Sequence, residues 1–172
     1  MQNWVRWLLL GILSAVFGLL ALGNAVAASI AVTLVTGLLF VIAGAGQVWI
    51  GVGEAGAGHK IFAVLLGVLM VVLGISFIKN PLEGTISLAL LVTILIAAGG
   101  AIRLMLSFAM RQTPFFWSML ISGALSVLLA GYILANFAAV SVALLGVLLG
   151  IELLFSGAGL ITFALFLRSR QG

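Results

Sequence analysis

Three polar side chains interrupt the long apolar runs of this sequence: Gln47, Arg103 and Glu152. Glu152 is the most isolated, because its nearest charged neighbours along the chain are Arg111 and Arg168. A charged group inside a bilayer costs about 3 kcal/mol or more, so it faces other helices, pairs with a partner or becomes protonated. Three roles follow for Glu152: a hydrogen bond that packs helices, a response to protons, or a position on the path of an ion or solute.

A regular spacing relates these groups, since Gln47 plus 56 is Arg103 and Arg103 plus 56 is Gly159. We expect these positions to form one polar level near the ends of three helices, with room left at Gly159. Glu152 precedes Gly159 by seven residues, which puts it on the same helix face and about 10 Å deeper. Ser156 shares that face. At this offset we expect Glu152 to be interior without a tight ion pair to Arg103, and loss of hydration to favour its protonated form.

Simpler interpretations stay open for both charged groups. The simplest role for Glu152 is a structural hydrogen bond to a serine or a backbone carbonyl, or a pair to Arg103. Arg103 lies only eight residues before Arg111, so its side chain is long enough to extend its guanidinium toward the lipid headgroups.

The composition indicates an integral membrane protein. The 172 residues are 65% hydrophobic and 6% charged, with a mean hydropathy of +1.47, far from the balance of soluble domains. The 7 Lys and Arg are scattered, which argues against nucleic acid as a partner. With no Cys and one His, the chain has no thiol nucleophile, disulfide framework or metal cluster. We therefore expect no catalytic site, no cofactor and no metal.

Six continuous apolar runs predict six transmembrane helices. Each run has about 20 residues or more, enough at 1.5 Å per residue to cross a hydrocarbon core of about 30 Å. Continuous rather than alternating apolarity favours helices over a barrel. The expected spans are 4–23, 27–52, 60–79, 83–109, 115–135 and 138–167.

Glycines indicate that the chain contains an internal repeat of 56 residues, because Gly11 plus 56 is Gly67 and Gly67 plus 56 is Gly123. We predict an all-α six-helix transmembrane bundle built from three parallel helical hairpins. It forms a single transmembrane domain, 1–172, with repeat units of about 4–56, 60–112 and 116–168. The first run resembles a secretory signal, but its place in the repeat predicts a retained helix.

Asparagines mark the expected turn inside each hairpin. Asn24, Asn80 and Asn136 have the same spacing as the glycines, and only Asn80 is followed by proline, at Pro81. Asparagine tolerates a left-handed backbone and caps helices, so we expect turn residues rather than ligands.

The cations predict the orientation. One set of helix ends carries most of them: Arg6, Lys60, Arg111, Arg168 and Arg170. The opposite ends carry Lys79, partly offset by Glu83. The positive-inside rule then places both termini in the cytoplasm. His59 lies beside Lys60 on the Gly-rich loop that also holds Glu54, where we expect solvated side chains.

Two motifs give the sequence a family resemblance. "GAIRLML" at 100–106 and "GIELLFS" at 150–156, set in three hairpins, resemble the HdeD family of bacterial acid-resistance membrane proteins. The resemblance implies a multi-pass protein of the bacterial inner membrane that is linked to acid stress. The family often has proline at the turn inside each hairpin, whereas Ala25 and Phe137 stand where Pro81 does.

Two functional hypotheses remain. The first is a non-enzymatic acid-stress protein in which Glu152 responds to protons and which works alone, as a homo-oligomer or with another membrane protein. The alternative is a small channel or transporter for protons or a small solute, with Glu152 and Arg103 in its path. In both cases the lipid bilayer surrounds the helices.

Overall fold

The computed structural model describes residues 3–53 and 56–169, which form six α-helices. Arg170 and Glu54 lie outside the described residues. All six helices are long and apolar enough to cross a membrane, which confirms the predicted fold class. The helices are α1 (Asn3–Gly23), α2 (Ala25–Val52), α3 (Ala57–Lys79), α4 (Pro81–Ala109), α5 (Phe116–Ala135) and α6 (Phe137–Ser169).

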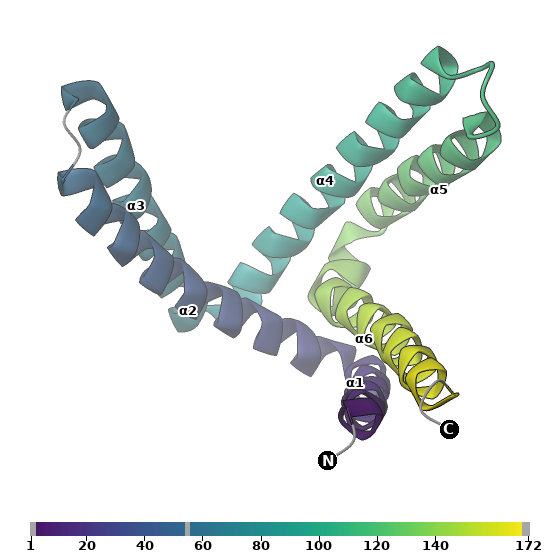
Figure 1. Ribbon diagram of the computed structural model, residues 1–172. Helices are drawn as coiled ribbons and strands as arrows, with labels where there is room; N and C mark the ends of the chain where they lie inside the picture. Colours follow the sequence, from purple (N-terminus) through teal and green to yellow (C-terminus); the bar gives the residue numbers. More distant parts are fainter. Residues whose placement is uncertain (1–2, 54–55, 170–172) are drawn as a thin grey trace.

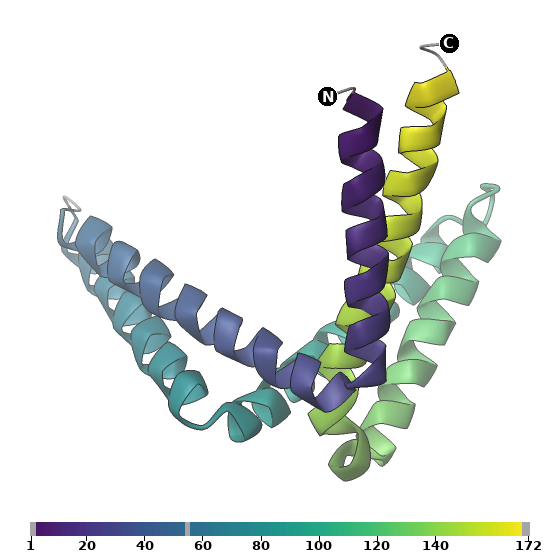
Figure 2. The ribbon, with the colours of Figure 1, turned by 90° about the horizontal axis from the view of Figure 1, so that it is seen from below.

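The helices form three two-helix arms that diverge from one region (Figures 1 and 2). α2 packs along α3, α4 along α5, and α1 along α6. The turns at Asn24, Asn80 and Asn136 lie where the arms meet, and we call this part the convergence region. The start of α1 and the end of α6 lie at the outer end of the same arm.

This pairing refines the expected hairpins. The two helices of one repeat unit are joined by a turn but separate beyond it, and α1 and α2 touch only sparingly. The extensive contacts are between neighbouring repeats, such as α2 with α3. A repeat unit is therefore an open V rather than a packed hairpin, and each arm combines the halves of two units.

Glycines hold each arm together by letting two backbones touch. A methyl group added at Gly44 would lie 2.6 Å from the carbonyl oxygen of Gly67, and one at Gly67 would lie 2.7 Å from that of Gly44. Such closeness leaves no room for a side chain and favours Cα–H···O contacts. Equivalent reciprocal contacts join Gly37 with Gly74, Gly100 with Gly123, Gly11 with Gly157 and Gly18 with Gly150.

The convergence region contains buried hydroxyl groups as well as apolar side chains. Ser29, Thr85 and Ser141 are buried at matching repeat positions. The hydroxyl oxygens of Thr33 and Thr85 lie 2.7 Å apart and link α2 to α4. The backbone N–H of Gly146 donates to Ser29 Oγ at 2.7 Å and links α6 to α2. These bonds fix the three second helices of the repeats to one another.

The asparagines at the turns do not use a left-handed backbone. Their φ angles are −139° at Asn24, −125° at Asn80 and −114° at Asn136. The side chain of Asn24 accepts a hydrogen bond from the backbone N–H of Ala27 at 3.3 Å and so caps α2. Asn80 precedes a helix that begins with Pro81, whose fixed φ suits the first helical position.

Candidate functional site: polar groups within the spans

Glu152 is exposed on α6 rather than enclosed. Leu145 and Ser141 precede it by seven and eleven residues, and both are buried in the convergence region. At 100° per residue, all three lie within about 20° of one direction around α6. Glu152 thus points to the side of α6 that faces the other arms, but at a level where those arms have already separated.

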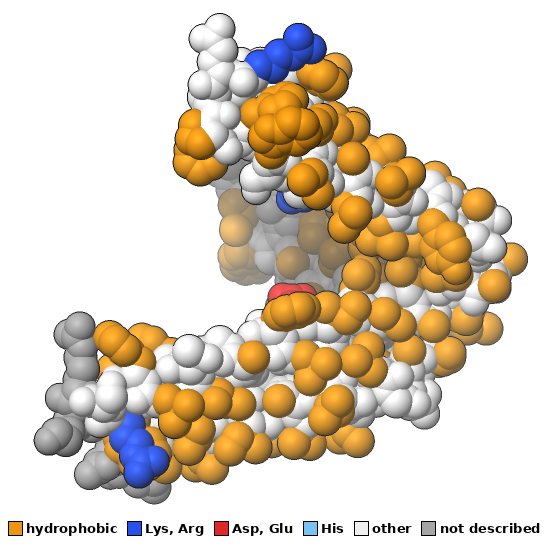
Figure 3. Space-filling model, turned by 90° about the vertical axis from the view of Figure 1, so that its right-hand side faces the viewer, with side chains coloured by type: hydrophobic (Ala, Val, Ile, Leu, Met, Phe, Trp, Pro, Cys, Tyr) orange, Lys and Arg blue, Asp and Glu red, His pale blue; other side chains and the backbone are white. Residues whose placement is uncertain are grey.

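A hollow separates the arms beyond the convergence region. Figure 3 shows it bordered mainly by hydrophobic side chains, with few charged groups on the visible face. The expected interior position of Glu152 fails for this reason: its helix face is the inward one, yet no neighbouring helix covers it at that level.

Arg103 and Gln47 lie on two further arms, so the structure does not bring the three predicted polar groups together. Arg103 is exposed on α4, and its Nη1 donates to Ser126 Oγ of α5 at 3.5 Å, a long hydrogen bond. Gln47 is half-buried on α2. Ser156 is exposed one turn beyond Glu152 on α6.

Gly159 does not occupy the position on α6 that is equivalent to Gln47 and Arg103. Gly44, Gly100 and Gly157 make equivalent contacts, and the step from Gly100 to Gly157 is one position longer than the step from Gly44 to Gly100. The position equivalent to Arg103 is therefore Leu160, and the prediction of Gly159 was wrong by one residue. The repeat register is kept up to Ser141 and shifts before Gly150, within α6.

Two serines on α5 lie beside Arg103 and form a polar group with it, which the sequence analysis did not predict. Ser122 and Ser126 lie four residues apart on the side of α5 next to Arg103. The Ser126 hydroxyl donates to the carbonyl oxygen of Ser122 at 2.9 Å, and the Ser122 hydroxyl donates to that of Met119 at 3.2 Å. Their spacing of one helical turn in an apolar run was the available signal.

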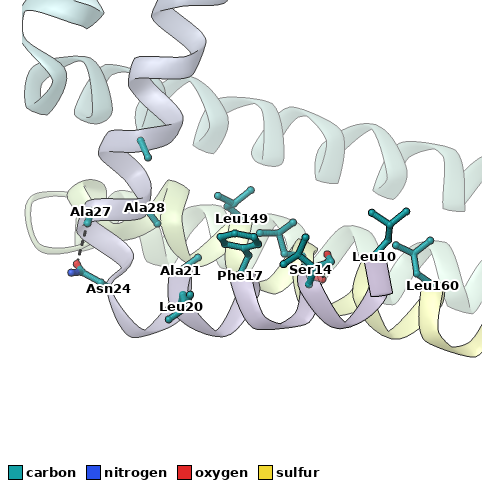
Figure 4. A pocket seen from close by; sticks show the side chains of 13 residues that line it. Leu10, Ser14, Phe17, Leu20, Ala21, Asn24, Ala27, Ala28, Leu149 and Leu160 are labelled. Atoms are coloured by element: carbon teal, nitrogen blue, oxygen red, sulfur yellow. Dashed lines mark hydrogen bonds between the residues drawn. The ribbon is translucent and has the colours of Figure 1, made fainter. Parts of the chain in front are cut away.

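A larger groove lies beside α1 but offers little chemistry. It has a volume of about 820 Å³ and is lined mostly by leucine and alanine from three helices (Figure 4). Its polar side chains are engaged within the protein: Ser14 Oγ donates to the carbonyl oxygen of Leu153 at 2.9 Å, and Asn24 caps α2. An apolar groove on a spanning helix is a surface for lipid tails.

The charged and titratable side chains near α6 are few. The helices that contact α6 are α1, α2, α4 and α5. Among their described residues, these groups are Arg6 on α1, Glu83 and Arg103 on α4 and Tyr132 on α5. Within the described part of the chain, no three His, Cys, Asp or Glu residues are grouped to hold a metal. His59 is exposed at the start of α3.

Comparisons with known proteins agree with the repeat. The profile of a short repeat of unknown function (DUF308) matches residues 9–79 and again 65–135. The second match begins and ends 56 residues after the first, which equals the spacing of the glycines. Each match covers three successive helices, so the family unit includes the contact between neighbouring repeats, α2 with α3 and α4 with α5.

The chain is also similar to Protein HdeD of Escherichia coli K12, with 36% identity over 110 residues. That alignment covers 62% of this chain and 58% of the relative. Protein HdeD of Escherichia coli O157:H7 and of Shigella flexneri match to the same extent. The chain thus spans somewhat over half the length of the curated relatives it matches. No solved structure matches it. Neither the family description nor the relatives' names indicate an enzyme. With six helices long and apolar enough to span a bilayer, this multi-pass membrane protein belongs to the family of the short repeat of unknown function.

Proposed function

We propose that this protein is a non-enzymatic component of the bacterial inner membrane that helps the cell to withstand acid, the role that resemblance to the HdeD family implies. Residues 1–172 act as one transmembrane domain made of three repeat units, with both termini in the cytoplasm. The candidate proton-responsive group is Glu152. Similarity to Protein HdeD, at 36% identity over 110 residues, supports the context.

The observation that carries the role of Glu152 is its position on the inward face of α6. An ionised carboxylate there holds water or a cation in the hollow between the arms, because leaving it bare in hydrocarbon costs about 3 kcal/mol or more. Protonation removes that cost. The uncharged side chain then allows lipid or another arm to approach α6, so acidification shifts the population toward more closed arms.

The channel alternative has less support. At the convergence region the helices pack through an apolar cluster of Phe77, Leu88 and Leu145. Such apolar packing does not favour a water-filled path across the convergence region, and the described residues place few polar groups along the hollow to replace the hydration of an ion.

The proposal is tested by acid survival in bacteria that lack their own copy of the gene. Cells carrying the wild-type protein should survive acid shock better than cells with an empty vector. Glu152→Gln, which mimics the protonated carboxyl, should abolish the pH dependence of a distance measured between spin labels on the α1/α6 and α4/α5 arms. Glu83→Gln is the matched control, since Glu83 is exposed in the first turn of α4.

Either of two results would contradict the proposal. The first is wild-type survival equal to the empty vector, which removes the link to acid. The second is an arm distance that changes with pH equally in wild type and Glu152→Gln, which removes the role of this carboxyl.

Orientation has a separate test, because the chain contains no natural cysteine. A single cysteine at Asn136 should react with a membrane-impermeant thiol reagent from outside spheroplasts. A single cysteine at Ser169 should react only after the membrane is opened. The reverse pattern would place the termini outside the cytoplasm.

A further inference from the structure

The α4/α5 arm contains a pocket with one polar end and one apolar end. It has a volume of about 550 Å³. Arg103, Ser122 and Ser126 form the polar part, and three leucines form the rest: Leu125, Leu128 and Leu129. Arg103 and Ser126 also line a second pocket of about 280 Å³, whose other lining residues belong to α4.

Arg103 brings a positive charge into this pocket, and the described residues leave that charge largely uncompensated. The guanidinium has five N–H donors, and its hydrogen bond to Ser126 is long, at 3.5 Å. The acceptor is a neutral hydroxyl rather than a carboxylate. An arginine within a span is costly unless it is paired or reaches a lipid headgroup, and the exposed face of Arg103 opens onto the pocket.

The direction of the pocket matches that of a lipid in one leaflet. α5 begins at the outer end of the arm and runs toward the convergence region, so Ser122 lies nearer the outer end than Leu128 and Leu129. The outer end also carries Arg111 and Trp117, which are exposed and suit the headgroup region. A headgroup at the polar end would therefore have its tail directed toward the middle of the membrane.

We propose that this pocket is a binding site for an anionic phospholipid. Its phosphate accepts hydrogen bonds from the Arg103 guanidinium beside Ser122 and Ser126, and one acyl chain lies along Leu125, Leu128 and Leu129. Arginine favours phosphate because its planar donors bind two oxygens at once. Basic pockets between spanning helices on the cytoplasmic side are known to take such headgroups.

The other arms lack this combination at equivalent positions. In the α2/α3 arm, Gln47, Leu66 and Met70 stand where Arg103, Ser122 and Ser126 do, as the equivalent glycine contacts establish. In the α1/α6 arm the corresponding residues are Leu160, Leu10 and Ser14. The site is therefore specific to one arm, and one bound anionic lipid per chain is expected.

The test measures binding of spin-labelled phosphatidylglycerol to the full chain in phosphatidylcholine bilayers. The wild type should select this lipid over spin-labelled phosphatidylcholine with the same chains. Arg103→Gln should reduce the selectivity roughly fivefold, as loss of one cation near anionic lipid predicts. Arg103→Lys, which keeps the charge, should retain more of the selectivity than Arg103→Gln does.

Arg111→Gln is the matched control, because it removes the same charge from the same arm at a residue packed on the Phe108 ring. It should change the selectivity less than Arg103→Gln does. Ser122→Asp is a second variant that keeps Arg103 but puts a carboxylate in the pocket, and it should abolish the selectivity.

Equal effects of Arg103→Gln and Arg111→Gln would overturn the proposal, since general attraction to cations would explain them. Unchanged selectivity in Ser122→Asp would also overturn it. Displacement of the lipid by inorganic phosphate, but not by sodium chloride at matched ionic strength, would overturn the lipid assignment in favour of an anion site that does not require an acyl chain.

Discussion

The α2/α3 and α4/α5 arms have the same backbone contact but different side chains around it. Gly44 meets Gly67 in one arm and Gly100 meets Gly123 in the other. Beside these glycines, the first arm has mainly apolar side chains, whereas the second has a guanidinium and two hydroxyls. The repeat thus supplies a packing scaffold, and the positions next to the glycines vary without disturbing it.

The largest expected effect comes from filling the glycine contact. Gly67→Leu should lower the free energy of unfolding by about 3 kcal/mol, because the side chain meets the backbone of α2 at a position where a methyl already lies 2.7 Å from Gly44 O. Gly46→Leu is the control, since nothing lies within 4 Å of a methyl there, and it should change stability by less than about 0.5 kcal/mol. Denaturation in mixed micelles measures both. Similar losses for the two would mean that α2 and α3 do not pack through these glycines.

Smaller effects on stability are expected from substitutions one level closer to the convergence region, where the two arms differ. Gly37 and Gly74 meet in the first arm, whereas the repeat equivalents Thr93 and Ala130 are buried in the second. Gly74→Ala should cost about 2 kcal/mol by overpacking, and Ala130→Gly about 1 kcal/mol by loss of a buried methyl. The same denaturation series checks both values. Stabilisation by either substitution would contradict the prediction, because it would mean that the helices of both arms prefer the same distance from each other at this level.

Transplanting the polar group should give the α2/α3 arm its own lipid selectivity. The triple variant Gln47→Arg, Leu66→Ser and Met70→Ser reproduces the residues of the α4/α5 arm. It should increase selectivity for phosphatidylglycerol by up to about fivefold, roughly 1 kcal/mol. Gln47→Lys alone is the control for charge. An equal gain from that single change would mean that the hydroxyls contribute nothing to the site.

The smallest effects should distinguish two serines at equivalent positions. Ser14 Oγ donates to a carbonyl of the neighbouring helix at 2.9 Å, so Ser14→Ala should cost about 0.6 kcal/mol of stability. Ser126 Oγ donates within its own helix and accepts the long bond from Arg103. Ser126→Ala should leave stability nearly unchanged and lower lipid selectivity less than twofold. The prediction fails if Ser126→Ala is the more destabilising of the two.

Much of the fold follows from the sequence, because long apolar runs have few alternatives in a membrane. The six spans, the repeat period and the turns at the asparagines are all visible in the residue order. The partner of each helix was not predictable in the same way. Gly11 and Gly67 show which face of each helix can pack closely against another helix. They do not show whether that other helix belongs to the same repeat unit or to the neighbouring one.

The candidate site was predictable only in part. An isolated carboxylate at Glu152 and a cation at Arg103 stand out in apolar runs, and both helices were correctly identified. Their surroundings depend on how far the arms diverge, which is a tertiary property that residue spacing does not encode. The single-residue shift within α6 also broke the register on which the expected level at Gly159 relied. Ser122 and Ser126 were overlooked because hydroxyls are common in spanning helices.

The pairing of α1 with α6 makes the order of synthesis important for this chain. α2 and α3 leave the ribosome one after the other, as do α4 and α5, so each of these pairs is able to form as soon as its second helix is inserted. α1 enters the membrane before the other five helices, yet the glycines that face Gly11 and Gly18 are on the last of the six, at Gly157 and Gly150. Throughout translation its close-packing face is open to any passing helix, including α6 of an earlier copy. Closure of this arm is therefore a late step, and it is the point in biogenesis at which exchange between copies competes with correct folding.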